Sequence, residues 1–151
     1  SNLITSGNVT VDDLFDARLL LEPHIAKAAA KHASNEALKK FEALFEDSDS
    51  HYEDAVRLKQ NNLEFHLLLA RASGNPVLSV MLESVIELLI ELSLDFTDLA
   101  LERKFLKIHK GIFKVLSQRK AAEVSRLIRK DIAAVRETLK AYKKYEKVAS
   151  S

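Results

Sequence analysis

Apolar residues recur every three to four positions along almost the whole chain, and no segment shows the alternation of a half-buried strand. This spacing is typical of amphipathic helices, which bury one stripe of side chains. It predicts helices that begin after Thr10, after Ser34 and near residue 120, and three more over about residues 52–72, 76–96 and 98–116. Three glycines and two prolines fit long helices with short connections. The pattern therefore predicts an all-α antiparallel bundle of about six helices.

Helix boundaries are marked by residues that cap or break helices. Thr10 and Ser34 are candidate N-caps, because their hydroxyls accept hydrogen bonds from the first helical turn. Residues 73–76 (Ser-Gly-Asn-Pro) stop one helix and start the next. Pro23 is expected to interrupt and bend the first helix. Residues 47–50 are polar and are expected to form a connector.

Composition narrows the class of protein. The chain has 151 residues, of which 47% are apolar and 30% charged, with a net charge of +1 and no cysteine. These values predict one globular domain over residues 10–148, preceded by a tag remnant and linker over residues 1–9. The absence of cysteine excludes disulfides and thiolate metal sites and fits a cytoplasmic location. The most apolar stretch carries acidic residues, so no membrane-spanning segment is expected.

Two histidines on apolar stripes are the candidates for chemistry. Asn62 precedes His66 by four residues, one helical turn, and Asp131 follows His109 by 22 residues. We expect a helix, a short loop and the facing helix to fill that interval, which brings both pairs to the middle of the bundle. A histidine on an apolar face is more often a hydrogen-bonded core residue than a metal ligand, so the pattern alone leaves both readings open.

Four segments together resemble a known family, the FCD domain, which is the C-terminal effector-binding domain of FadR-subfamily regulators in the GntR family. The resemblance covers about residues 10–142 and lies in the order and spacing of the segments rather than in any one of them. They are Arg18-Leu-Leu-Leu-Glu22-Pro23 followed by the alanine-rich residues 26–30, Asn62-Leu-Glu-Phe65-His66, Ala72-Ser-Gly-Asn75-Pro76, and His109 with a helical pair ending at Asp131.

The resemblance implies a bundle of six or seven helices with a central cavity for a ligand and metal. Many members of the family bind a divalent metal there, and a small carboxylate effector sits on the metal. In the full regulators a winged helix-turn-helix domain precedes the bundle and binds operator DNA as a homodimer. Nothing in this chain resembles that DNA-binding domain. The resemblance thus implies the sensor half of a bacterial transcription regulator, and not an enzyme.

The family's metal ligands carry over only in part. The family uses one aspartate and three histidines, and the corresponding positions here are Asn62, His66, His109 and Asp131. Imidazole, carboxylate and amide donors still suit Zn²⁺, Ni²⁺, Mn²⁺ or Fe²⁺, with a lower affinity than the family pattern. Arg18 is the candidate for contact with an effector carboxylate, because a guanidinium pairs with it through two hydrogen bonds. The alternative is that Arg18 forms a structural ion pair with Glu22.

Two other functions compete with a metal-dependent sensor. The substitutions at Asn62 and Asp131 keep open a regulator domain without metal, which dimerises or binds an apolar or acyl ligand. A metal-dependent enzyme is the weakest reading, because the chain lacks the Glu-x-x-His pairs of di-iron bundles and any evident nucleophile and base. Apolar surface on the first helix and on the helix at 76–96 is expected to form the dimer or coupling contacts.

Overall fold

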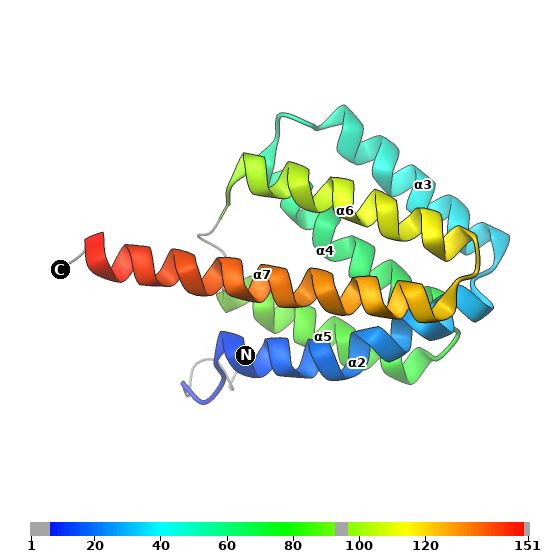
Figure 1. The fold of residues 1–151 in the computed structure, drawn as a ribbon, viewed down its shortest axis with the longest axis horizontal. Coiled ribbons are helices and arrows are strands. Elements are labelled where there is room, and N and C mark those ends of the chain that lie inside the picture. Colours follow the sequence, from blue (N-terminus) through cyan, green and yellow to red (C-terminus); the bar gives the residue numbers. More distant parts are fainter. Residues whose placement is uncertain (1–6, 93–96, 150–151) are drawn as a thin grey trace.

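The computed structural model describes residues 7–92 and 97–149, and the side chains of that part up to residue 142. It is an all-α bundle, and from α2 to α5 and from α6 to α7 the helices follow one another through short connections (Figure 1). The described residues form six helices: α2 (Val11–His32), α3 (Asn35–Ser50), α4 (Ala55–Ala72), α5 (Pro76–Leu92), α6 (Leu99–Ser117) and α7 (Ala121–Ala149). The predicted fold class is confirmed.

Local capping explains most helix starts. Thr10 forms a capping box with Asp13, and the Ser34 hydroxyl accepts from the backbone N–H of Ala37. Asn75 accepts from the first turn of α5, and Gly74 takes a left-handed φ of 78° before it. Asp54 caps α4, which therefore begins three residues later than the expected start at residue 52.

Two boundary predictions are wrong. Pro23 does not interrupt the first helix, because α2 continues through it to His32. Proline removes only one backbone hydrogen bond, and packing of α2 against α4, α5 and α7 holds the helix on both sides of it. Residues 47–50 are not a connector but the last turn of α3. Their polar groups serve α4 instead: Asp47 pairs with Arg57 at 2.9 Å and accepts from Asn61 at 2.7 Å.

Helix α4 is the central element. It packs against α2, α3, α5 and α6, while α2 makes its most extensive contact with α7. An aromatic group, Phe41, Phe45, Phe65 and Phe113, joins α3, α4 and α6, with ring centroids 5.4–6.0 Å apart. A polar side chain on the inner face of α4 is thus surrounded by other helices and removed from water.

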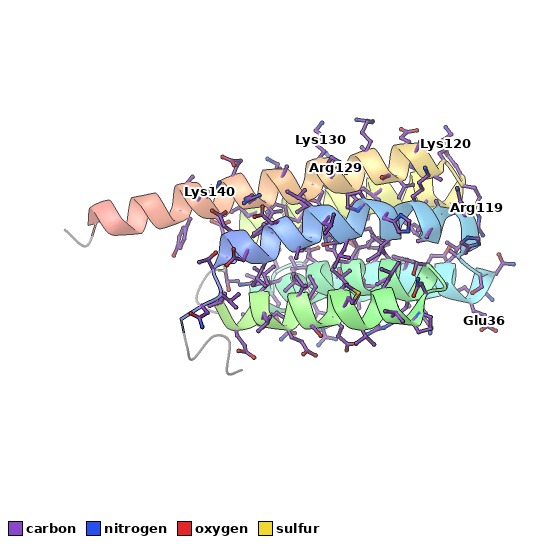
Figure 2. All side chains as sticks on the ribbon, turned by 90° about the horizontal axis from the view of Figure 1, so that it is seen from below. Glu36, Arg119, Lys120, Arg129, Lys130 and Lys140 are labelled. Atoms are coloured by element: carbon purple, nitrogen blue, oxygen red, sulfur yellow. The ribbon has the colours of Figure 1, made fainter. Side chains whose placement is uncertain are left out.

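Part of the outside of the bundle, along α7, is polar. Arg129 and Lys130 on α7 point away from the other helices (Figure 2). The predicted end of the fourth helix at residue 96 lies outside the described residues, and α5 ends at Leu92 within them. Among the described helices, none combines the length and the apolar character that a membrane crossing requires.

Candidate metal and effector site

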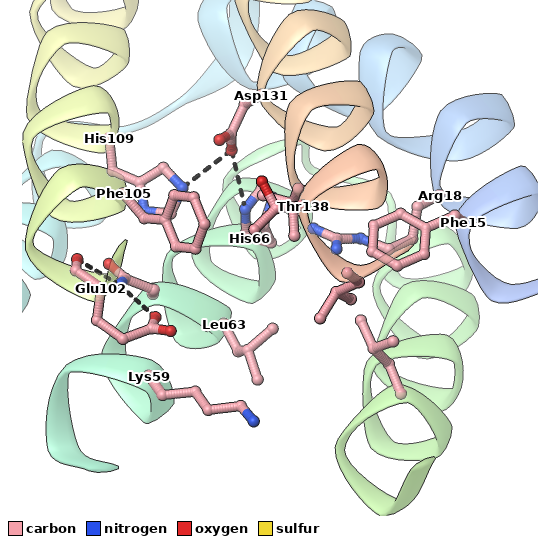
Figure 3. Close-up of a pocket in the computed structure, with 14 residues that line it drawn as sticks. Phe15, Arg18, Lys59, Leu63, His66, Glu102, Phe105, His109, Asp131 and Thr138 are labelled. Atoms are coloured by element: carbon pink, nitrogen blue, oxygen red, sulfur yellow. Dashed lines mark hydrogen bonds and ion pairs between the residues drawn. The ribbon is translucent and has the colours of Figure 1, made fainter. Parts of the chain in front are cut away.

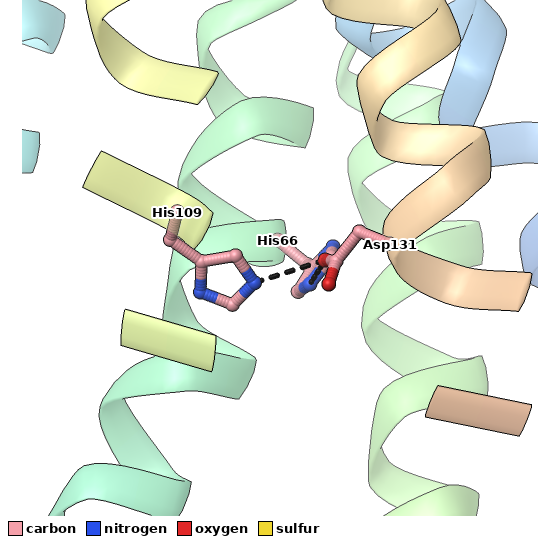
Figure 4. Close-up of side chains that lie close together, drawn as sticks. All are labelled: His66, His109 and Asp131. Carbon is pink, nitrogen blue, oxygen red and sulfur yellow. Dashed lines mark hydrogen bonds and ion pairs between the residues drawn. The ribbon is translucent and has the colours of Figure 1, made fainter. Parts of the chain in front are cut away.

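Three helices each place one potential metal ligand at the centre of the bundle. His66 comes from α4, His109 from α6 and Asp131 from α7, and all three are buried (Figure 4). Asp131 Oδ2 lies 3.0 Å from His109 Nε2 and 3.4 Å from His66 Nε2. One ligand atom from each residue lies within 4.8 Å of the others. The group can therefore hold a metal ion.

The donor atoms fit a divalent transition metal. Ligand atoms about 2.0–2.2 Å from a tetrahedral metal lie roughly 3–4 Å from one another, close to the spacing found here. Asp131 Oδ1 and His109 Nδ1 are buried without a hydrogen-bond partner among the described residues. A buried carboxylate oxygen without a partner is costly, and a bound cation would satisfy it. The third and fourth predicted residues of the set, His109 and Asp131, thus meet His66.

Glu22 orients His66 from the far side. His66 Nδ1 and Glu22 Oε1 form a short hydrogen bond, which holds the imidazole Nε2 toward Asp131. A carboxylate behind a metal-binding histidine is a common arrangement, because it fixes the tautomer and the ring orientation. Glu22 also accepts from Arg18 Nε at 2.5 Å, so the ion pair considered as an alternative for Arg18 is present. Arg18 nevertheless lines the pocket beside Phe15 and Thr138 (Figure 3).

Burial and charge act against each other in this network. Burial raises the pKa of Glu22, but the charges of Arg18 and His66 outweigh it and lower that pKa to about 2. Burial opposes the charged form of His66, yet Glu22 raises its pKa overall. Burial lowers the pKa of His109. Despite its burial, the pKa of Asp131 is held well below the usual range by His109 and His66.

The amide nitrogen of Asn62 forms hydrogen bonds away from the three candidate metal ligands. Its Nδ2 donates to both the backbone oxygen and the carboxylate Oε1 of Glu102, each at 3.0 Å. This contact joins α4 to α6 one helical turn from His66. Its predicted role as a fourth ligand, through the amide oxygen, stays a prediction. Glu102 itself is buried, and burial raises its pKa more than Asn62 and Lys59 lower it.

A pocket of about 70 Å³ opens beside the three ligands. Its wall is mostly apolar, and its polar groups are those already described together with Lys59 and Thr138 (Figure 3). The apolar lining residues are Phe15, Leu63, Leu89, Phe105, Val135 and Leu139. A small apolar pocket with convergent polar groups is the usual form of a small-molecule site.

The family model of the FCD domain matches residues 13–141. This chain belongs to the FCD family. The FCD domain is a regulatory, effector-binding module of GntR-family transcription regulators and not an enzyme domain, so the regulatory reading and the non-enzyme prediction are confirmed. No curated protein matches the chain significantly.

A solved structure supports the same assignment. This FCD domain is similar to the Streptococcus agalactiae GntR, with 28% sequence identity and a TM-score of 0.70. The match covers 83% of this chain and 57% of the streptococcal chain, so this chain spans little more than half the length of that protein.

Sequence reasoning missed two members of the site. Glu22 entered only as a partner for Arg18, and its contact with His66 on another helix had no signal in the sequence. The spacing of Glu102 could have identified it. It lies seven residues before His109 and fourteen before the buried Leu116, which places all three on the same face of α6.

Proposed function

We propose that this FCD domain binds a small carboxylate effector through a divalent metal held by His66, His109 and Asp131, with Asn62 as the fourth candidate ligand. The observation that supports it is the convergence of three buried ligand atoms from three helices at the end of a pocket. A metal there would supply a Lewis-acidic positive charge for the effector carboxylate. Zn²⁺, Ni²⁺, Mn²⁺ and Fe²⁺ all suit the donor set.

Arg18 completes the anion-binding end of the pocket in this proposal. Its Nε is used by Glu22, which fixes the side chain, while the guanidinium has five N–H donors in total. The remaining donors can pair with a ligand carboxylate. Because Arg18 and Glu22 belong to α2, and the metal ligands to α4, α6 and α7, an effector held by both groups would draw four helices together.

Regulation by an effector requires a second conformation of the domain. An effector changes a protein's conformation only if it binds one arrangement better than the other. We propose that the favoured helix arrangement changes the relation between two DNA-binding domains in a homodimer, which places the regulator in the bacterial cytoplasm and makes operator DNA a partner of the full protein. The winged helix-turn-helix domain that would bind it lies outside this sequence.

The first test is metal-dependent binding of a simple carboxylate. Pentanoate is titrated by calorimetry into the chain with one equivalent of Zn²⁺ and, in parallel, into chain treated with chelator. We expect binding heat only with Zn²⁺, because Arg18 alone is partly neutralised by Glu22. Equal binding in both samples would favour the metal-free regulator domain. No binding in either would overturn the carboxylate assignment.

Of the competing functions, a metal-free site for an apolar ligand draws support from the apolar pocket wall. The size of the pocket argues against a long acyl chain. Drug-sized ligands occupy pockets of about 300–1,000 Å³, whereas this pocket measures about 70 Å³. The carboxylate reading therefore stays the better supported one.

An exposed apolar face on α5 is the proposed dimer surface. Val77, Val80 and Met81 follow one another at helical spacing and are 66%, 63% and 46% exposed. We expect Met81→Glu to convert a dimer into a monomer, since it places a charge in the centre of that face. Light scattering after size exclusion measures the mass. Ala43→Glu, which adds the same charge on α3, is the control and should stay dimeric. A dimeric Met81→Glu variant would place the interface elsewhere.

A further inference from the structure

Glu102 is a buried acid in the pocket wall that the metal site does not use. Its side chain is 4% exposed and lines the same pocket as His66 and His109. In Figure 3 its carboxylate lies on the side of Leu63 and Lys59, away from Asp131. The pocket therefore has a second polar group, apart from the three metal ligands.

The carboxylate of Glu102 is only partly satisfied. Asn62 Nδ2 donates to Oε1, and the charge of Lys59, which lines the same pocket, also acts on the carboxylate. A carboxylate offers about four lone-pair sites. Because Glu102 lines the pocket, the lone-pair sites that Asn62 does not use can accept from a ligand there.

The position of Glu102 determines how long a ligand must be to contact both Glu102 and the metal ligands. Glu102 precedes His109 by seven residues on α6, about 10 Å along the helix, and its partner Asn62 precedes His66 by one turn, about 5.4 Å. Glu102 is therefore set back from the metal ligands along the helices, and apolar side chains such as Leu63 and Phe105 line the same small pocket. A short chain with a polar group at each end matches this arrangement.

We propose that Glu102 selects effectors that carry a hydrogen-bond donor, a hydroxyl or an ammonium group, at the end opposite the carboxylate. Asn62 is then a positioning residue, which holds the Glu102 carboxylate against α6. This inference rests on the proposed carboxylate site and adds the chemical class of the other end of the ligand. A ligand that ends in a methyl group would displace water from Glu102 and leave the acid with no donor beyond Asn62.

The experiment compares ligands of equal size. Pentanoate, 4-hydroxybutanoate and 4-aminobutanoate have the same number of heavy atoms and differ only in a terminal methyl, hydroxyl or ammonium group. Butanoate, 3-hydroxypropanoate and 3-aminopropanoate form a second, shorter set. Each is titrated by calorimetry into the Zn²⁺-loaded chain. We expect the best donor-bearing acid to bind about tenfold or more tightly than the methyl acid of its set.

Two variants locate the preference. Glu102→Leu removes the acceptor and should abolish the preference, while Glu102→Gln keeps a neutral acceptor and should lose preference for ammonium more than for hydroxyl. Zinc content and the far-ultraviolet circular dichroism spectrum show whether each variant retains the fold and the metal. The wild-type comparison needs no variant, so a poorly folded variant does not decide the result.

The outcomes separate this inference from the function on which it rests. Zinc-dependent binding without any difference within both sets overturns the role of Glu102 and leaves the carboxylate site intact. A preference that persists in Glu102→Leu also overturns it. Absence of zinc-dependent binding for all six acids overturns both proposals.

Discussion

Glu22→Ala is expected to destabilise the domain by about 3–5 kcal/mol, because it removes one partner from a buried ionic network and leaves the others uncompensated. Glu22 accepts from Arg18 at 2.5 Å and is hydrogen-bonded to His66, and all three side chains are at most 5% exposed. Without the carboxylate, the guanidinium has lost its only ion-pair partner among the described residues. Urea unfolding followed by circular dichroism measures the change.

Two further variants make this prediction specific. Glu22→Gln keeps the size and some hydrogen bonds, so it should cost less than Glu22→Ala. Glu46→Ala removes an exposed glutamate from α3 and should change the free energy of unfolding by less than about 0.5 kcal/mol. If Glu22→Ala is as stable as Glu46→Ala, the buried network contributes nothing to folding.

The same carboxylate gives stability a defined dependence on pH. The pKa of Glu22 is lowered from 4.5 to about 2 in the folded chain. The unfolded state therefore binds the proton first, and the contribution of Glu22 is fully present above pH 4.5 and is lost as the pH falls toward 2. Asp131, whose pKa is also lowered, acts in the same direction. The melting temperature of the wild type should fall more steeply over this range than that of Glu22→Gln.

His109→Ala is expected to lower zinc affinity by about 100-fold or more. Even residues behind the direct ligands typically change metal affinity by 10–100-fold, and this variant removes a nitrogen that lies 3.0 Å from Asp131 Oδ2. Elemental analysis of wild-type chain, purified without chelator or histidine tag, should give about one equivalent of transition metal. The variant should give almost none.

A matched histidine controls for weak surface binding. His24 on α2 is exposed, so His24→Ala should bind zinc as the wild type does. Zinc at 100 times its dissociation constant should stabilise the wild type and His24→Ala by about 2.7 kcal/mol, and His109→Ala far less. His109→Gln serves as a second variant, since His109→Ala also removes the ring stacked 4.2 Å from Phe65. Wild-type chain that takes up no Zn²⁺ or Ni²⁺ would refute the metal site.

Much of the fold follows from local rules in the sequence. The hydroxyls of Thr10 and Ser34 and the Asn75 amide act within one helical turn, so their capping roles are visible in a short window. The prediction for the end of α3 was wrong because that boundary depends on contacts that are distant in sequence. Asp47 looks like a connector residue by composition, but its partners Arg57 and Asn61 lie ten and fourteen residues away. Tertiary contacts decide such boundaries.

The positions of the candidate ligands were predictable where the spacing of residues within a helix, or across one short loop, determined them. His66 and His109 occupy inner positions of α4 and α6, and the interval to Asp131 matched a helix, a loop and the facing helix. The contacts of Glu22 with His66 and of Asn62 with Glu102 join residues 44 and 40 positions apart. No local rule gives such pairings, so the acids that surround the predicted ligands emerged only from the structure.

The close packing of α2 against α7 has a consequence for synthesis on the ribosome. Arg136 on α7 pairs with Asp12 on α2 across 124 residues of sequence. Contacts between segments so far apart form late, because the whole intervening chain has to emerge before they close. Until α7 appears, α2 lacks the helix with which it makes its most extensive contact. Translation of the α7 segment therefore completes the bundle, and a pause before α7 has emerged leaves an incompletely packed species prone to aggregate.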